Sequence, residues 1–333
     1  MSLKEYMLHD HKEQVYAFYK MIHPKAQDYD KLTRNDIYND IISLYKEDPE
    51  IILRLCSMEE IHILKKLLDE NILRREHGYI DYLLFQDLEK HYLILHNENE
   101  YYIPDDFVNC VKMAMNLFDE QTVMLQDVLD SVLIGVCRIY NVLALNQVAQ
   151  ILKEHSISYD DQHLKDYIKR QPKLKDKMDV IRYKNVNYLV SLEFNYYQDV
   201  FKLRKDFQRA TYSLEELISF GKYKLNLFQD SVLQFLNFLE IHLRPSSIDE
   251  LINDLIFYAG FDINSDGILW DICDHIEDLY KEVVPIISEF PIWIYSGNSL
   301  KHLKENVVLP GKNDPCICGS GKKFKNCCEK LFK

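Results

Sequence analysis

Four cysteines near the end of the chain have the residue type and the spacing of a metal site. One residue separates Cys316 from Cys318, and eight residues then precede the adjacent pair Cys327 and Cys328. Closed structural zinc sites are tetrahedral and strongly prefer thiolate ligands. We therefore expect these cysteines to bind one structural zinc ion (Zn2+), in a site that leaves no coordination position open for a substrate.

The residues between the two cysteine pairs suit such a site. Gly319 and Gly321 allow the backbone to turn sharply around an ion, and Lys322, Lys323 and Lys325 add positive charge beside the thiolates. Nearby positive charge lowers the pKa of a cysteine thiol. Because so short a segment has almost no core of its own, metal binding should supply its folding free energy.

Two alternative interpretations of this segment are weaker. Adjacent cysteines are awkward disulfide partners, disulfides are rare in the cytoplasm, and no thioredoxin-like pattern surrounds these residues. The Gly-Ser-Gly-Lys string of residues 319–322 resembles part of a phosphate-binding loop, but that loop needs four residues between its glycines. Zinc binding therefore remains the favoured interpretation.

The segment also resembles a known motif. Residues 314–328, Asp-Pro-Cys-Ile-Cys-Gly-Ser-Gly-Lys-Lys-Phe-Lys-Asn-Cys-Cys, are similar to the SEC-C zinc motif, named for the C-terminus of the preprotein-translocase ATPase SecA. The resemblance implies that the four cysteines are the zinc ligands, the last being Cys where some members have His. It also implies contact with a chaperone, the ribosome or a lipid surface. It covers only this segment, and no Walker or helicase motif accompanies it, so ATPase activity is not implied.

The composition indicates a mainly α-helical protein. With 333 residues, 47% of them hydrophobic, the chain can bury a substantial core, and its length predicts about two or three domains. Only nine glycines and nine prolines occur, which favours helices over an all-β or doubly wound architecture.

The sequence also predicts a cytoplasmic location. No uncharged apolar run is long enough to span a membrane, and residues 1–12 do not have the pattern of a signal peptide. The other four cysteines stand singly in apolar, helix-like stretches, where reduced cysteine behaves as a small hydrophobic residue: Cys56, Cys110, Cys137 and Cys273.

Residues 1–125 are predicted to be helical and to contain a winged-helix-like unit. Ser57 and Glu60 form a capping box for a helix that runs through Glu70, and residues 79–88 have the pattern of a further helix. Residues 91–96 and 100–103 then form two apolar runs on either side of a polar turn, as in a β-hairpin. Helix, helix and hairpin is the order of a winged helix.

Residues 126–210 repeat that order and predict a second winged-helix-like unit. An apolar helix is expected over 128–140, a second from Asn146 to His155, and a third from Asp160 or Asp161 to Arg170. Residues 178–183 and 186–190 then pair as a hairpin across the turn at residues 184–185.

Residues 211–306 have helical periodicity throughout and predict a bundle, and residues 307–333 form the zinc motif. We expect Trp293 to pack on this bundle and Ser299 to cap its last helix. Residues 262–267 follow the opening of a calcium loop, but the glutamate expected at its twelfth position is Cys273. A loop between helices, with Asn264 and Ser265 as candidate caps, is therefore favoured there.

A group of basic residues lies where the third helix and the hairpin of the second unit are expected. Residues 165–184 include eight basic residues and three acidic ones. Helix-turn-helix proteins commonly turn this surface toward DNA. The alternative is a solvated, lysine-rich loop. The eight residues are Lys165, Lys169, Arg170, Lys173, Lys175, Lys177, Arg182 and Lys184; a second basic strip comprises Lys202, Arg204, Lys205 and Arg209.

These features predict a non-enzymatic binding or regulatory protein. No catalytic motif is present, and no small-molecule substrate is inferred. The net charge of −13 opposes diffuse attraction to phosphate, so nucleic acid would bind at the basic residues 165–184 while the zinc segment docks a macromolecular partner. The alternative is a protein adaptor of the secretion or translation apparatus, in which the zinc segment contacts a chaperone or the ribosome.

Overall fold

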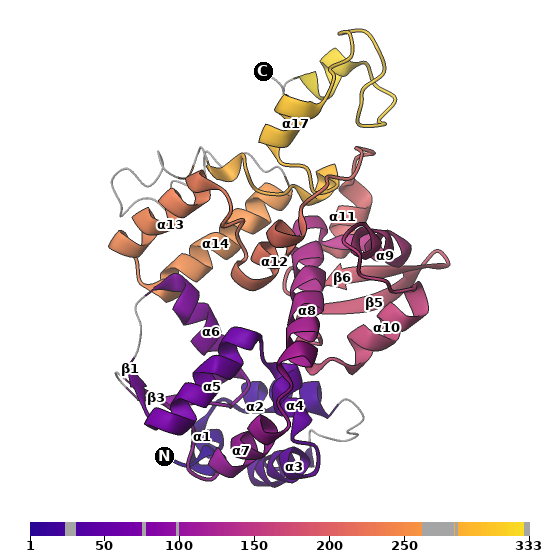
Figure 1. Cartoon of the computed structure of the whole chain (residues 1–333). Helices are drawn as coiled ribbons and strands as arrows, with labels where there is room; N and C mark the ends of the chain where they lie inside the picture. The colour runs from indigo at the N-terminus through magenta and orange to yellow at the C-terminus, as the bar shows by residue number, and fades with distance from the viewer. Residues whose placement is uncertain (24–30, 75–77, 98–99, 262–282, 284–285, 330–333) are drawn as a thin grey trace. The chain divides into compact units, whose positions relative to one another are not determined.

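The computed structural model describes residues 1–23, 31–74, 78–97, 100–261, 283 and 286–329 (Figure 1). The chain divides into two compact units: residues 1–130 with 166–176 form unit 1, and residues 131–165 with 177–333 form unit 2. Most described residues lie in helices, so the mainly α-helical class is confirmed. The calcium-like loop of residues 262–267, with its candidate caps, and Cys273 lie outside the described residues.

Unit 1 is built mainly from helices. The predicted capping box starts α5, where the Ser57 hydroxyl accepts a hydrogen bond from the Glu60 amide and the Glu60 carboxylate accepts one from the Ser57 amide. The helices of the unit are α1 (Leu3–His9), α2 (Lys12–Ile22), α3 (Arg34–Glu47), α4 (Glu50–Leu55), α5 (Met58–Glu70), α6 (Tyr79–Lys90), α7 (Val108–Asn116), α8 (Glu120–Tyr140) as far as Asp130, and the short 3-10 helix η2 (Pro172–Leu174).

Unit 1 also contains a small antiparallel sheet. Its strands are β1 (Leu73–Arg74), β2 (Leu95–His96) and β3 (Glu100–Tyr102), in the order β1-β3-β2. The predicted hairpin corresponds to β2 and β3, whereas β1, between α5 and α6, was not predicted because two residues show no alternating pattern. Phe85 of α6 stacks on Tyr101 of β3, with ring centroids 4.1 Å apart, so the sheet shares the core of the helices.

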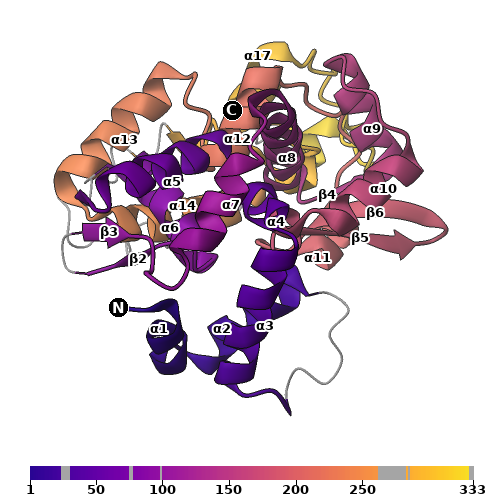
Figure 2. The same cartoon turned by 60° about the horizontal axis from the view of Figure 1, so that its bottom comes forward.

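Unit 2 contains a second three-stranded sheet and the remaining helices. The sheet has the order β4-β6-β5, from β4 (Val142–Ala144), β5 (Met178–Tyr183) and β6 (Val186–Ser191) (Figure 2). The helices are the rest of α8, α9 (Leu145–Glu154), the start of α10 (Asp161–Arg170), α11 (Tyr197–Leu203), α12 (Leu214–Tyr223), α13 (Asp230–His242), α14 (Pro245–Gly260) and α17 (Leu300–Asn306), with the 3-10 helices η3 (Trp293–Tyr295) and η4 (Phe324–Asn326).

The hairpin β5–β6 has the turn that its sequence predicts. Lys184 and Asn185 have φ angles of +45° and +65°, and Tyr183 pairs with Val186 on either side of them. Two consecutive positive φ angles are typical of the type I′ turn that suits the twist of two-residue hairpins. Strand β4, which adds a third strand to this hairpin, was not predicted.

Glycines allow α8 and α12 of unit 2 to pack unusually closely. A Cβ atom on Gly135 would lie 2.1 Å from the Leu217 carbonyl oxygen, and one on Gly221 would lie 1.9 Å from that of Ser131. Any side chain at either position would therefore force the two helices apart.

Trp293 packs on α14, as predicted, because its ring lies against Gly260. This side chain is fully buried, and its indole nitrogen donates a 2.9 Å hydrogen bond to the Arg138 carbonyl oxygen. Ser299 caps α17 by accepting a hydrogen bond from the His302 amide. These contacts anchor the chain just before the cysteine segment.

Among the described helices, none combines the length and the apolar character needed to cross a bilayer.

Candidate metal centre

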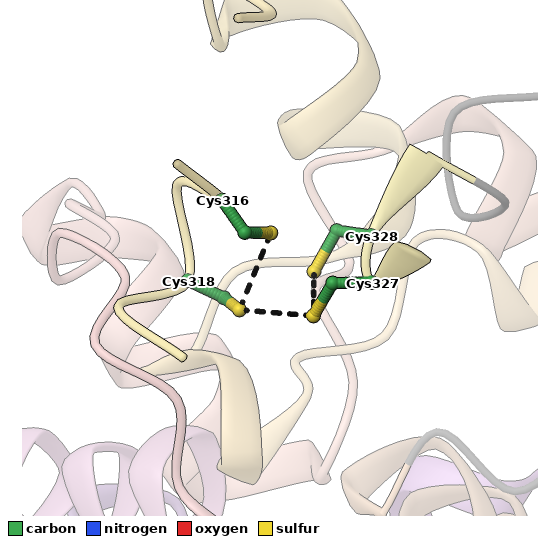
Figure 3. A group of neighbouring side chains, drawn as sticks. All are labelled: Cys316, Cys318, Cys327 and Cys328. Carbon is green, nitrogen blue, oxygen red and sulfur yellow. Dashed lines mark hydrogen bonds between the residues drawn. The ribbon is translucent and has the colours of Figure 1, made fainter. Parts of the chain in front are cut away.

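The four cysteines of the final segment converge on one point. Figure 3 shows their sulfur atoms directed toward one another, and all four lie within 4.8 Å of each other. The Cys318 sulfur is 3.4 Å from those of Cys316 and Cys327, and the Cys327 and Cys328 sulfurs are 3.8 Å apart. Tetrahedral zinc with bonds of about 2.3 Å would separate its sulfur ligands by about 3.8 Å, whereas a disulfide needs about 2.05 Å. The donor set therefore fits a metal ion.

The backbone holds the two cysteine pairs on two short turns. The Cys316 amide donates to the Lys322 carbonyl oxygen over 2.8 Å, and Pro315 forms an antiparallel bridge with Lys323. This closes a loop around the first pair. The 3-10 helix η4 leads directly into the second pair, and the Cys327 amide donates to the Phe324 carbonyl oxygen.

Hydrogen bonds at the cluster favour a thiolate. Burial opposes ionisation of Cys318, but hydrogen bonds from Ser320 and the neighbouring thiols outweigh burial and lower the pKa of Cys318 to about 6. Burial raises the pKa of Cys328, and the Lys205 ammonium group acts in the opposite direction. Lys205 lies far away in sequence, whereas the adjacent Lys322, Lys323 and Lys325 are exposed.

The cysteine segment shares a hydrophobic core with the rest of unit 2. The Asp206 amide donates a 3.0 Å hydrogen bond to the Cys318 carbonyl oxygen. The buried residues of this shared core come from three parts of the chain: Phe207, then Ile292, Ile294, Tyr295 and Leu303, and finally Cys316, Cys318, Phe324 and Cys328. Asp206 and Phe207 lie about a hundred positions before the cysteines, so no local pattern could predict their contacts with this segment.

Residues 205–207 connect the cysteine segment to η3. The Lys205 amide donates to the Ile294 carbonyl oxygen over 2.8 Å, and its ammonium group lies 3.0 Å from the Tyr295 hydroxyl. Phe207 meets the same tyrosine edge-on, with centroids 5.2 Å apart. In the sequence, Lys205 belongs to the predicted basic strip, and this connecting role was not predicted because a Lys-Asp-Phe tripeptide carries no recognisable signal.

Two glycines of the cysteine segment offer a matched test of its docking on Asp206. Gly319 and Gly321 have φ angles of +71° and +70°, so alanine at either position is strained by about 1 kcal/mol. A Cβ on Gly319 would lie only 2.6 Å from the Cβ of Asp206, whereas one on Gly321 meets nothing within 4 Å. We therefore expect Gly319→Ala to lower the free energy of unfolding by about 1 to 3 kcal/mol more than Gly321→Ala does, as measured by urea unfolding of the metal-loaded chain.

Hydrogen exchange at the Asp206 amide would show where that extra loss arises. Gly319→Ala should accelerate it, and Gly321→Ala should leave it close to the wild-type rate. Equal exchange rates in the two variants would contradict a docking role for this contact.

The structure divides the eight predicted basic residues between the two units. Lys169 and Arg170 are exposed in unit 1. In unit 2, Arg182 and Lys184 are exposed on the β5–β6 hairpin, and Lys165 is partly exposed on α10. The remaining three do not lie on the surface as expected: Lys173 and Lys177 are buried and Lys175 is half-buried.

Lys173 is an internal anchor of unit 1. Its ammonium group lies 3.2 Å from the Glu60 carboxylate, and both side chains are buried. Burial opposes its charge, but Glu60, Asp127 and other carboxylates outweigh burial and raise the pKa of Lys173. Lys175 donates to the Met21 carbonyl oxygen over 3.1 Å. An internal role for these lysines was missed because charge alone does not reveal which side chains turn inward.

The curated proteins to which the chain is similar match it over short stretches. A UPF0225 protein of Shewanella sp. (strain MR-7) is 47% identical over 53 residues, which are 16% of this chain and 30% of that protein. The SecA subunit of the protein translocase of Chlorobium phaeobacteroides (strain BS1) is 81% identical over 36 residues, or 10% of this chain and 4% of SecA. No solved structure matches the chain. Residues 313–330, which contain all four cysteines, match the SEC-C motif.

Proposed function

We propose that the protein is a non-enzymatic, zinc-containing binding protein whose β5–β6 hairpin contacts nucleic acid. The supporting observation is the arrangement around this hairpin. Helix α8, strand β4, helices α9 and α10, and the hairpin follow in the chain order of a winged helix, and β4 joins the hairpin as the third strand. Arg182 and Lys184 are exposed beside its turn.

Zinc is the metal that the cysteine site suits best. A tetrahedral set of four thiolates selects zinc or iron–sulfur chemistry, and the sulfur spacing matches a single ion. The four cysteines would hold the ion, and zinc bound in this way supplies folding free energy without redox chemistry. Metal analysis of the purified chain should find one zinc per molecule.

Electrostatics requires nucleic-acid contact to be local. The chain carries a net charge of −13, so phosphate is attracted only where basic side chains stand clear of acidic ones. The exposed members of the predicted basic group 165–184 form two sets that variants can separate. One set is Lys169 and Arg170, and the other is Arg182 and Lys184.

Fluorescence anisotropy with labelled DNA and RNA across a salt series tests this function. Binding at low salt should weaken steeply as salt rises, and Arg182→Gln/Lys184→Asn should reduce the slope of log affinity against log salt by about 2. Asparagine is chosen at 184 because it tolerates the positive φ angle there. Lys169→Gln/Arg170→Gln tests the other set, and Lys112→Gln, an exposed lysine of α7, is the control. No affinity at low salt would refute nucleic-acid binding.

A second candidate function is a protein adaptor. Val308 and Leu309, just before the cysteine loop, are 91% and 46% exposed, and the exposed Lys312, Lys322 and Lys323 follow. Apolar side chains beside lysines suit an acidic protein surface. The SecA resemblance of this segment supports the same function. If the salt series detects no nucleic-acid binding, the adaptor becomes the favoured function.

A further inference from the structure

The β5–β6 hairpin and α11 of unit 2 together present aromatic rings beside positive charges. Tyr183 and Tyr188 lie on the same face of the hairpin, because their cross-strand partners are Val186 and Ile181 respectively. Phe201 of α11 packs on that face, with its ring centroid 5.0 Å from that of Tyr183 and 4.8 Å from that of Tyr188. Tyr183 remains 44% exposed in this cluster.

One basic residue lies over these rings, and another follows them in sequence. The Lys184 ammonium group lies 5.2 Å from the centroid of the Tyr183 ring, and Lys202 follows Phe201 on α11 with its side chain 71% exposed. Lys202 pairs with Asp199, but both partners are exposed, and such a pair contributes little and exchanges readily. Asp179, at the start of β5, is the other exposed acidic residue of these elements.

The remaining basic residues of the 202–209 strip are engaged inside unit 2. Arg204 donates a 2.7 Å hydrogen bond to the Tyr140 carbonyl oxygen, and Lys205 interacts with Tyr295. Arg209 lies 3.2 Å from the Glu154 carboxylate. Of this strip, Lys202 therefore keeps its charge on the surface, next to Phe201 in sequence.

We propose that Tyr183, Tyr188 and Phe201, with Lys184 over the Tyr183 ring, form a surface on which bases of single-stranded nucleic acid stack. This inference rests on the proposed nucleic-acid function and specifies its ligand. Aromatic side chains bind unpaired bases by stacking, while neighbouring cations bind the phosphate backbone. A duplex keeps its base faces covered by neighbouring base pairs, so it offers the exposed Tyr183 ring nothing to stack on.

The choice of a nucleic acid over a protein follows from charge. In a protein whose net charge is −13, the exposed ring of Tyr183 has a lysine over its face, and the exposed Lys202 follows Phe201 in the sequence of α11. A polyanion with flat apolar groups complements both features. Figures 1 and 2 show the hairpin projecting from unit 2, so a flexible strand can reach its tip.

Anisotropy with a labelled 12-nucleotide uridine or thymidine single strand, and with the matching duplex, tests this inference on the full chain. The single strand should bind more tightly than the duplex. Tyr183→Ala should weaken single-strand binding about tenfold to a hundredfold, as expected for one lost stacking contact. Tyr183→Phe keeps the ring and should retain the wild-type affinity.

Phe228→Ala is the matched control, because Phe228 is an even more exposed aromatic residue of unit 2, at 66%, outside this cluster. It should leave binding unchanged, and thermal unfolding checks that each variant is folded. Unchanged single-strand affinity in Tyr183→Ala, or tighter binding of the duplex, would overturn the stacking surface. If salt-dependent binding then still responds to Arg182→Gln/Lys184→Asn, the proposed function survives. Absence of any nucleic-acid binding overturns both.

Discussion

Removal of the metal ion is expected to open the core of unit 2 as well as the cysteine loop. Cys316, Cys318 and Cys328 are buried against Phe207 and Ile292, so the loop leaves an apolar surface behind when it loses its metal crosslink. Exposing each large apolar side chain costs about 1.5 to 3 kcal/mol. Chelation should therefore lower the melting temperature of unit 2 by roughly 10 °C or more.

Hydrogen exchange with and without chelator is the decisive measurement. Protection should disappear both in the cysteine loop and at the amides of Lys205 and Asp206, which donate to Ile294 and Cys318 respectively. Cys328→Ser should reproduce the effect without chelator. Cys137→Ala, at a buried cysteine of unit 2 outside the site, should keep the wild-type response to chelator. Free exchange in the loop with unchanged protection at Asp206 would show that the loop folds independently.

Replacing Lys173 is expected to destabilise unit 1 strongly. Its ammonium group is the partner of the buried Glu60 carboxylate, and Asp127 and Asp130 are buried carboxylates that also act on it. Without the lysine, Glu60 loses the charge that most strongly opposes its desolvation and keeps the Ser57 amide as a donor, while Asp130 keeps those of Tyr167 and Gln171. Removing one partner of a buried ion pair costs about 3 to 5 kcal/mol, so urea unfolding of Lys173→Met should show a loss of that size.

Lys169→Met is the matched control for this change. Lys169 belongs to the same basic stretch of sequence and to the same unit but is exposed, so its replacement should change the free energy of unfolding by less than about 0.5 kcal/mol. The double variant Glu60→Gln/Lys173→Met removes one of the buried charges that Lys173→Met leaves behind and should recover part of the loss. Equal stability of Lys173→Met and Lys169→Met would rule out an anchoring role for this ion pair.

Local features of the fold followed from the sequence because their causes lie within a few residues. The capping box of Ser57 and Glu60 and the cap at Ser299 depend on hydrogen bonds that span three positions. The turn at Lys184 and Asn185 depends on their own φ angles. The grouping of the four cysteines followed equally from their spacing, because a loop of this length brings them within reach of one ion.

Features made by distant residues were decided by the tertiary structure. Strands β1 and β4 contain two and three residues, and they exist because β3 and β6, far along the chain, supply their hydrogen-bond partners. A strand this short shows no period of its own. The order of each sheet therefore emerged only from the packing of the whole unit.

Charge and composition predicted where basic residues gather along the chain but not which way they point. Lys169 and Lys173 are one helical turn apart in sequence, yet the first is exposed and the second is buried against Glu60, more than a hundred positions away. The same distinction applies to the candidate metal site. The sequence alone predicted the grouping of its four cysteines, because their spacing is local, whereas the docking of this segment on Asp206 and Phe207 was decided by hydrophobic burial between distant segments.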